Sequence, residues 1–267
     1  MKIIVPIKQV PETSRVKINE ETGTIIRDGV ENIINPLDLY SIEVALKLRE
    51  DNGGEITVIS MGPPKAETAL REAIAMGADE AILISGREFA GSDSWATAYV
   101  LSSLIDKLKP YDLVITGERA TDGDTGQVGP AIASFLNLPL STYTGKIREI
   151  TKDHIITERL IEEGYERLKL PLPALLTVIK EIAYPRLPTL RGKQKARTVN
   201  IAVNSGRDLD VKEEKLGLSG SPTRVVKIYR PKVTRKGTIL QVKDEKTLTE
   251  AVDKLISYLK EKKIISF

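Results

Sequence analysis

A run of small and polar residues in the middle of the chain has the composition of a phosphate-binding loop. Residues 117–130 read GERATDGDTGQVGP. Small residues let backbone N–H groups approach a phosphate closely, and a helix N-terminus after such a loop adds partial positive charge. Thr121, Thr125 and Gln127 supply neutral donors at the same place. Because the loop has no lysine and no GxxxxGK[ST] pattern, it predicts nucleotide binding without Walker-type hydrolysis.

The charged side chains of this loop allow more than one interpretation. Asp122 and Asp124 could hold Mg²⁺ or act as acid and base, or they could form Asx turns that shape the loop. The second interpretation is favoured, because no further carboxylate cluster lies within a few residues. Arg119 is equally suited to pairing with a phosphate, stacking on a ring or forming a surface ion pair.

Strands and helices alternate on both sides of this loop. Residues 112–116 are apolar and bounded by turn residues, as in a buried parallel strand, and 128–136 have helical spacing. Further strands are predicted at 2–8, 56–60 and 81–85, and further helices at 38–52, 66–75 and 94–108. The alternation predicts an α/β fold: a mostly parallel open sheet, of the adenine-nucleotide-binding type, with helices on both faces.

Four loops are expected to meet at one edge of that sheet, because the carboxyl ends of parallel strands lie together. They are residues 6–9, 35–38, 60–63 and 117–128. Lys8 ends the first strand there. Asn35 could read the edge of an adenine or could simply start a helix, and its position after the strand-like Ile33-Ile34 mildly favours the first. The convergence predicts a nucleotide pocket.

After residue 140 the pattern changes. A hairpin is predicted from 155–161 and 165–170 around Gly164, followed by a strand at 173–179. The remaining segments are a Pro-rich basic stretch at 184–195, an aperiodic stretch at 204–238 and an amphipathic helix at 248–260, with Thr247 and Glu250 as its capping box. We therefore expect a nucleotide-binding domain at 1–203 and a C-terminal arm at 204–267. Roughly 35 irregular residues exceed what compact domains tolerate, so the arm's helix is expected to dock on another subunit rather than fold back.

Composition excludes several classes of function. The chain has 267 residues, with 40 basic and 37 acidic side chains and a net charge of +3, so no nucleic-acid partner is expected. It has no cysteine and one histidine, His154, which excludes thiolate catalysis, histidine metal clusters and hydrolase triads. No run of 18 apolar residues occurs, so we expect a cytoplasmic protein with no direct membrane insertion. Without catalytic side chains of its own, its redox or group chemistry must come from a cofactor.

Several motifs, in their order and spacing, resemble the β subunit of electron-transfer flavoprotein. They are Val5-Pro6-Ile7-Lys8-Gln9-Val10-Pro11, Ile34-Asn35-Pro36, Met61-Gly62-Pro63, Ala75-Met76-Gly77-Ala78-Asp79 and Gly117 to Pro130. Tyr184–Lys195, with Leu187-Pro188 and trailing lysines, is similar to that family's recognition loop. The resemblance covers nearly the whole chain.

This resemblance implies a heterodimer with an α subunit that carries the redox-active FAD and is wrapped by the C-terminal arm. Ordinary members of the family hold AMP in the β subunit, whereas electron-bifurcating members hold a second FAD there and oxidise NADH. Residues 122–130 and the insertion-like 25–30 are similar to the bifurcating type. The sequence departs from that type at Gly126, where Ala is usual, and at Glu118-Arg119, where Arg-Gln is usual.

Loop chemistry and resemblance together assign cofactor contacts to one set of residues and partner docking to Leu187. The cofactor set is Pro6, Lys8, Asn35, Pro36, Leu37, Asp38, Met61, Gly117, Arg119, Ala120, Thr121, Asp122, Gly123, Asp124, Thr125, Gly126, Gln127 and Val128. The implied partners are a dehydrogenase or quinone oxidoreductase and ferredoxin. A stress-protein-like ATP-binding module would share the fold but lack the arm. An ATP-pyrophosphatase would need an SGGxDS-like loop that Val5-Pro6-Ile7-Lys8 does not provide.

Overall fold

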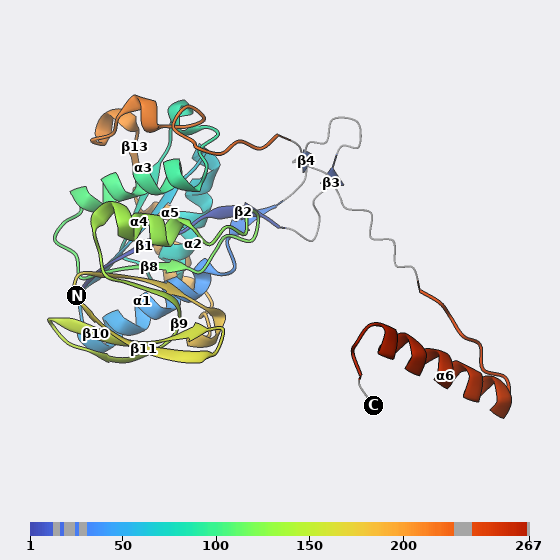
Figure 1. Cartoon of the computed structure of the whole chain (residues 1–267). Coiled ribbons are helices and arrows are strands. Elements are labelled where there is room, and N and C mark those ends of the chain that lie inside the picture. Colours follow the sequence, from blue (N-terminus) through green and yellow to red (C-terminus); the bar gives the residue numbers. More distant parts are fainter. Residues whose placement is uncertain (13–16, 19–24, 27–30, 227–236, 266–267) are drawn as a thin grey trace. The chain divides into compact units, whose positions relative to one another are not determined.

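The structure is a computed structural model, and it describes residues 1–12, 17–18, 25–26, 31–226 and 237–265. Its main feature is a nine-stranded sheet (Figure 1). In spatial order its strands are β11 (Gly164–Pro171), β10 (His154–Ile161), β9 (Leu140–Ile150), β12 (Ala174–Val178), β8 (Leu113–Gly117), β1 (Lys2–Pro6), β6 (Glu55–Met61), β7 (Glu80–Ile84) and β13 (Ala202–Asn204). Neighbouring strands are parallel from β9 to β13, and β10 pairs antiparallel with β9 and β11. Two small antiparallel pairs, β2 (Gln9–Pro11) with β5 (Asn32–Ile34) and β3 (Lys17–Ile18) with β4 (Ile25–Ile26), lie outside this sheet.

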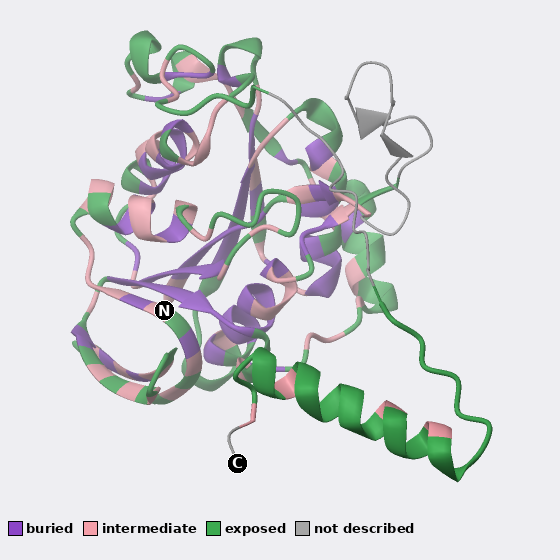
Figure 2. Ribbon diagram, turned by 45° about the vertical axis from the view of Figure 1, so that its right-hand side comes forward, coloured by how far each residue is buried: buried purple, intermediate pink, exposed green. Residues whose placement is uncertain are grey.

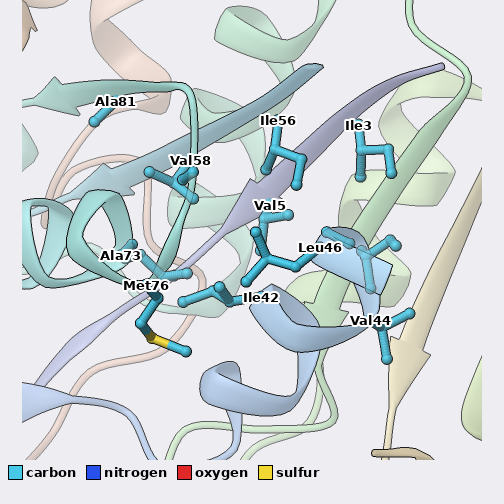
Figure 3. Packing of buried hydrophobic residues seen from close by; sticks show 14 of the residues in the cluster. Ile3, Val5, Ile42, Val44, Leu46, Ile56, Val58, Ala73, Met76 and Ala81 are labelled. Carbon is cyan, nitrogen blue, oxygen red and sulfur yellow. The ribbon is translucent and has the colours of Figure 1, made fainter. Parts of the chain in front are cut away.

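Helices cover both faces of the sheet. One buried cluster contains apolar side chains of α1 (Asp38–Asn52), α2 (Glu67–Met76) and α5 (Leu190–Thr198), and the other contains those of α3 (Ser94–Lys107) and α4 (Val128–Leu136). Short 3₁₀ turns occur at Pro64–Ala66, Arg87–Phe89, Lys180–Ile182, Gly206–Asp208 and Glu213–Lys215. Ile3 and Val5 of β1 pack in the first cluster, as Figure 3 shows, and Ile4 packs in the second. Because both faces of β1 are buried, its sequence is continuously apolar rather than alternating.

The chain leaves β1 and β8 in opposite directions. After β1 it passes through α1 to β6, and after β8 it passes through α4 to β9, on the other side of the sheet order. The carboxyl ends of β1 and β8 therefore flank a topological switch point, the place where open α/β sheets bind ligands. The predicted α/β fold with a mostly parallel sheet is confirmed.

Two compact units divide the chain at Lys227. Residues 204–226, which the sequence assigns to the arm, lie in the first unit. Leu209 and Leu216 are buried among side chains of α3 and α4, and the backbone N–H of Thr223 donates to Asp93 Oδ2 at 2.9 Å. Two isolated leucines without periodicity give no helix or strand signal, although both pack on the domain.

The second unit contains α6 (Glu245–Glu261), which is exposed along its length (Figure 2). The predicted capping box at Thr247 and Glu250 is wrong, because the helix begins earlier. Asp244 is the N-cap: its Oδ1 accepts from the backbone N–H of Thr247 at 2.8 Å, and Thr247 Oγ1 accepts from the N–H of Asp244 at 3.0 Å. Within the described ranges, no helix is both long and apolar enough to cross a membrane.

Candidate functional site

Asn35 fixes the loop between β8 and α4 (residues 118–127, the β8–α4 loop). Its Nδ2 donates to the carbonyl of Arg119 at 2.9 Å, and its Oδ1 accepts from the N–H of Thr121 at 3.1 Å. Asn35 is 1% exposed. Because both ends of its amide are bound to the loop backbone, Asn35 sets the conformation of the loop, a third role beside the two considered from sequence.

Asp38, the first residue of α1, joins three segments of the site. Its Oδ2 accepts from the N–H of Lys8 at 2.8 Å, and the Asn35 side chain and the N–H of Gly117 also hydrogen-bond to the carboxyl. Burial raises the pKa of Asp38 to about 7, against the opposing effect of these hydrogen bonds. A Cβ on Gly117 would lie 2.5 Å from Asp38 Oδ1 and 2.9 Å from the carbonyl of Leu37, so only glycine fits there. Pro36, which lies between Asn35 and Asp38 in the sequence, is exposed.

Two ion pairs involve the aspartates of the loop. Lys8 Nζ lies 2.7 Å from Asp122 Oδ1, and Arg119 Nε lies 2.8 Å from Asp124 Oδ1. Asp124 has a left-handed backbone, φ 53°, and its N–H donates to the carbonyl of Ala120 at 2.8 Å. Both carboxylates therefore pair with cations of the site, and the interpretation of the aspartates as Asx-turn formers stays a prediction. Three acidic or histidine side chains arranged to hold a metal ion are not found in the described part of the chain.

The first turn of α4 approaches the end of the sheet closely. A Cβ on Gly129 would lie 2.7 Å from Thr177 Cγ2 and 2.8 Å from Thr116 Oγ1, a buried hydroxyl without a hydrogen-bond partner. Gln127 is the N-cap, yet its side chain makes no cap hydrogen bond and instead accepts from Ser94 Oγ at 2.6 Å. The backbone N–H groups of this turn therefore have no side-chain cap, and they keep their capacity to bind an anion.

The remaining predicted residues lie at the same edge in different roles. Pro6 is buried at the end of β1, and Met61 ends β6 and packs against the α3–α4 cluster. No hydrogen bond or ion pair joins Met61 to the β8–α4 loop among the residues that the structure describes. Thr125 is exposed, Gly126 has φ 62°, and Val128 packs against the α3–α4 cluster. Gly123 has open space around it, since nothing lies within 4 Å of its Cβ position.

Three further residues of this edge are not in the set of cofactor residues predicted from the sequence. Glu118 is largely buried, and burial raises its pKa. Ser94 contacts Gln127, as described above, and could have been found because it starts the helix after β7. Tyr143 of β9 has φ 51°, and its hydroxyl lies 3.8 Å from the Cβ position of Gly126. The sequence pattern does not predict that Tyr143 lies at this edge, because its position depends on a register shift in β9.

The donor set fits a phosphate. Lys8 and Arg119 supply two cations, with side chains 49% and 45% exposed, beside the uncapped turn of α4 and the small residues of the loop. The same cations are neutralised by Asp122 and Asp124, so an entering phosphate would have to compete with or rearrange these pairs. Of the insertion-like stretch 25–30, Ile25–Ile26 form β4, and Arg27 to Val30 lie outside the described residues.

A second feature of the surface lies in the segment of residues 184–198. Tyr184, Leu187 and Leu190 are 93%, 85% and 87% exposed. Between the first two, Arg186 forms ion pairs with the buried Glu43 at 2.8 Å and with Glu50 of α1. Three large apolar side chains are thus held in solvent on a segment fixed to the domain by charge. The helix within this segment, α5, was not predicted.

Comparison with known proteins agrees with the fold. The family described as electron transfer flavoprotein domain matches residues 22–205. The electron transfer flavoprotein subunit beta of Thermoanaerobacterium thermosaccharolyticum is 47% identical over 266 residues, covering 99% of this chain and 100% of that protein. Subunit CarD of the caffeyl-CoA reductase–Etf complex of Acetobacterium woodii is 43% identical over 266 residues, covering 99% and 100%. The acryloyl-CoA reductase electron transfer subunit gamma of Anaerotignum propionicum is 41% identical over 264 residues, covering 96% and 98%.

Proposed function

The chain belongs to the electron transfer flavoprotein family, and from this premise we propose that it is the β subunit of a heterodimer that holds an adenine nucleotide at the β8–α4 loop. Through FAD, the heterodimer would pass electrons to partner oxidoreductases. One observation supports the nucleotide site above all. Lys8, the β8–α4 loop held by Asn35 and the first turn of α4, which has no side-chain cap, lie at one topological switch point.

In this proposal the chain's own residues bind and orient the nucleotide. Phosphate oxygens accept from backbone N–H groups of the loop and of the α4 turn, and Lys8 or Arg119 exchanges its carboxylate partner for the phosphate. Asn35 and Asp38 keep the loop in place, since both of their polar ends are bound to backbone. The flavin would supply the redox chemistry, and the protein would set the flavin's position and surrounding charge.

We further propose that the nucleotide is FAD and that the complex takes electrons from NADH by flavin-based bifurcation. Two observations support this. The relatives include subunits named for a caffeyl-CoA reductase–Etf complex and for electron transfer to acryloyl-CoA reductase. The loop tip is also open around Gly123, which leaves room for a pyrophosphate to continue past the position of a monophosphate. The second candidate is an ordinary β subunit with structural AMP.

Partner contacts are proposed at two surfaces. The exposed side chain of Leu187, flanked by Pro185 and Pro188, is suited to anchor a dehydrogenase or quinone oxidoreductase, because one well-buried aliphatic contact can dominate a transient interface. The apolar stripe of α6 is suited to cover the α subunit. Ferredoxin would be the second acceptor of a bifurcating complex.

The test is the nucleotide content of the purified αβ complex. After denaturation, the released nucleotides are identified by absorbance and mass, and the intact complex is titrated anaerobically with stoichiometric NADH. Two FAD per complex and bleaching of flavin absorbance are expected. One FAD and one AMP with no response to NADH would refute bifurcation and leave an ordinary β subunit. Absence of any nucleotide beyond the FAD of the α subunit would refute the site.

A further inference from the structure

Tyr143 occupies an irregularity at the edge of the sheet that faces the proposed nucleotide site. In the parallel ladder of β9 with β12, Leu176 aligns with Ser141 but Val178 aligns with Thr144, so β9 carries an extra residue between them. Tyr143 lies in this bulge with φ 51°, a left-handed conformation that is strained for a bulky side chain. Bulges of this kind commonly redirect a side chain beside a functional site.

Buried hydroxyl groups fix the backbone of the bulge. The N–H of Tyr143 donates to Thr177 Oγ1 at 3.0 Å, and Thr177 is 2% exposed. On either side of the bulge, Ser141 and Thr144 are fully buried, and their hydroxyls lie 2.9 Å apart. The strained conformation is therefore held by polar contacts on β9 and β12 and does not depend on burial of the tyrosine ring.

The side chain of Tyr143 is accessible to a ligand. Tyr143 is 43% exposed, and within the described parts of the chain its hydroxyl has no hydrogen-bond partner. That hydroxyl lies 3.8 Å from the Cβ position of Gly126, the last small residue before the α4 turn. In the order β9-β12-β8-β1, Tyr143 lies within β9 and Lys8 follows β1, so they approach the β8–α4 loop from opposite sides of β8.

Resting on the proposed function, we infer that Tyr143 binds the nucleotide, its hydroxyl donating to a phosphoryl oxygen held at Gly126 and the α4 turn. The phenol supplies a neutral donor on the side of the loop that lacks the Lys8 cation. A purely structural role does not account for the residue type, because glycine or asparagine adopts φ 51° with less strain. A ring that is nearly half exposed also contributes little burial.

The test uses the αβ complex stripped of the nucleotide of this subunit and titrated separately with AMP and with FAD by calorimetry. Tyr143→Phe removes only the hydroxyl and should weaken binding about three- to tenfold, the value of one neutral hydrogen bond. Tyr143→Asn removes the ring but tolerates the backbone conformation, and should weaken binding further with an unchanged or raised Tm. Tyr165→Phe removes the same group from the exposed Tyr165 on β11, two strands from β9, and should bind as the wild type does.

The outcomes separate this inference from the proposed function. If the wild-type complex and Tyr143→Phe bind both nucleotides equally, the role of Tyr143 is overturned and the nucleotide site stands. If Tyr143→Phe loses Tm in parallel with affinity, the hydroxyl is structural and the inference is likewise overturned. If the wild-type complex binds neither nucleotide, the proposed site fails and Tyr143 with it.

Discussion

At the scale of single residues, the site depends on polar side chains that bind backbone rather than on side chains pointing freely at a ligand. The side chain of Asn35 hydrogen-bonds to the backbone of Arg119 and Thr121, and that of Asp38 to the backbone of Lys8 and Gly117. Both side chains are buried. Burying a polar group costs free energy unless the group forms hydrogen bonds, and here the hydrogen bonds that meet this need also position the loop. Changing either residue should therefore affect stability and nucleotide binding together.

Asp38→Asn should change how stability depends on pH. The folded chain keeps the Asp38 proton up to a pKa of about 7, whereas the ordinary value is 3.8, so between these limits the folded state binds more protons than the unfolded state. Stability of the wild type should therefore fall as pH rises from about 4 to 7, by up to roughly 4 kcal/mol from this group. Asparagine does not titrate, so the variant should lack this contribution.

The measurement is the free energy of unfolding by urea at several pH values. At low pH the variant should be less stable by about 1–3 kcal/mol, because its amide places a donor against one of the backbone N–H groups. The difference should shrink toward pH 7. Asp124→Asn, at a side chain that is 71% exposed, serves as the control and should follow the wild type. Parallel curves for Asp38→Asn and wild type would contradict the assignment.

Gly117→Ala and Gly123→Ala form a matched pair in one loop region. At Gly117 a Cβ would lie 2.5 Å from Asp38 Oδ1 and 2.9 Å from the Leu37 backbone, whereas at Gly123 it would meet nothing within 4 Å. Gly117→Ala should cost about 1–3 kcal/mol of unfolding free energy and reduce nucleotide occupancy of the αβ complex, because the loop must move. Gly123→Ala should stay within about 0.5 kcal/mol of wild type, as an unhindered surface substitution does. Equal effects would show that the close approach at Gly117 is unimportant.

At the scale of elements, the segment of residues 184–198 is firmly attached yet exposes apolar side chains. Thr189 N–H donates to the carbonyl of Ala75, and Arg71 of α2 donates to the carbonyl of Ala196. Arg186 adds the ion pair with buried Glu43. A fixed apolar surface loses little conformational entropy on binding a partner, which favours a docking role over an accidental exposure.

Leu187→Ala tests that role. Because Leu187 is 85% exposed, truncation should change the free energy of unfolding by less than about 0.5 kcal/mol. If the segment docks a partner, KM for the electron-accepting or electron-donating dehydrogenase should rise about tenfold, with cofactor content unchanged. Leu160→Ala, at an exposed leucine of the hairpin, is the control. A loss of thermal stability with normal partner kinetics would mean that Leu187 packs on its own domain.

The sequence predicted those elements whose pattern reflects their own burial. Strands β1, β6, β7 and β8 read as apolar runs, as strands buried on both faces do, and α1 to α4 have apolar spacing, so the sequence predicts each of these elements. The short strands β2, β3 and β4 are not among the predicted ones. β9 was missed because its residues alternate around a bulge, and α5 because RGKQKART has no apolar stripe. The sequence predicts that the β8–α4 loop lies between a strand and a helix, but it does not predict the hydrogen bonds from Asn35, a distant residue in the sequence.

At the scale of the whole molecule, the described residues of the second unit, 237–265, include no buried side chain. α6 carries Leu248, Val252, Leu255, Ile256 and Tyr258 at exposures of 37–55%. An amphipathic helix of this length gains most of its stability from packing its apolar face. An exposed stripe on a separate unit therefore indicates a surface that is completed by another chain, in line with the proposed heterodimer.

Leu255→Glu should prevent stable pairing with the α subunit while leaving the first unit folded. A carboxylate in the middle of the apolar stripe would have to be buried unpaired in the interface, which costs several kcal/mol. Ser257→Glu adds the same charge on the opposite face of α6 and is the control. Both proteins are co-expressed with the α subunit and separated by size-exclusion chromatography. We expect the control and wild type to elute as the αβ complex and Leu255→Glu to elute without α, with unchanged cooperative unfolding of the first unit. Co-elution of Leu255→Glu with α at wild-type stoichiometry would mean that the stripe is not the pairing surface.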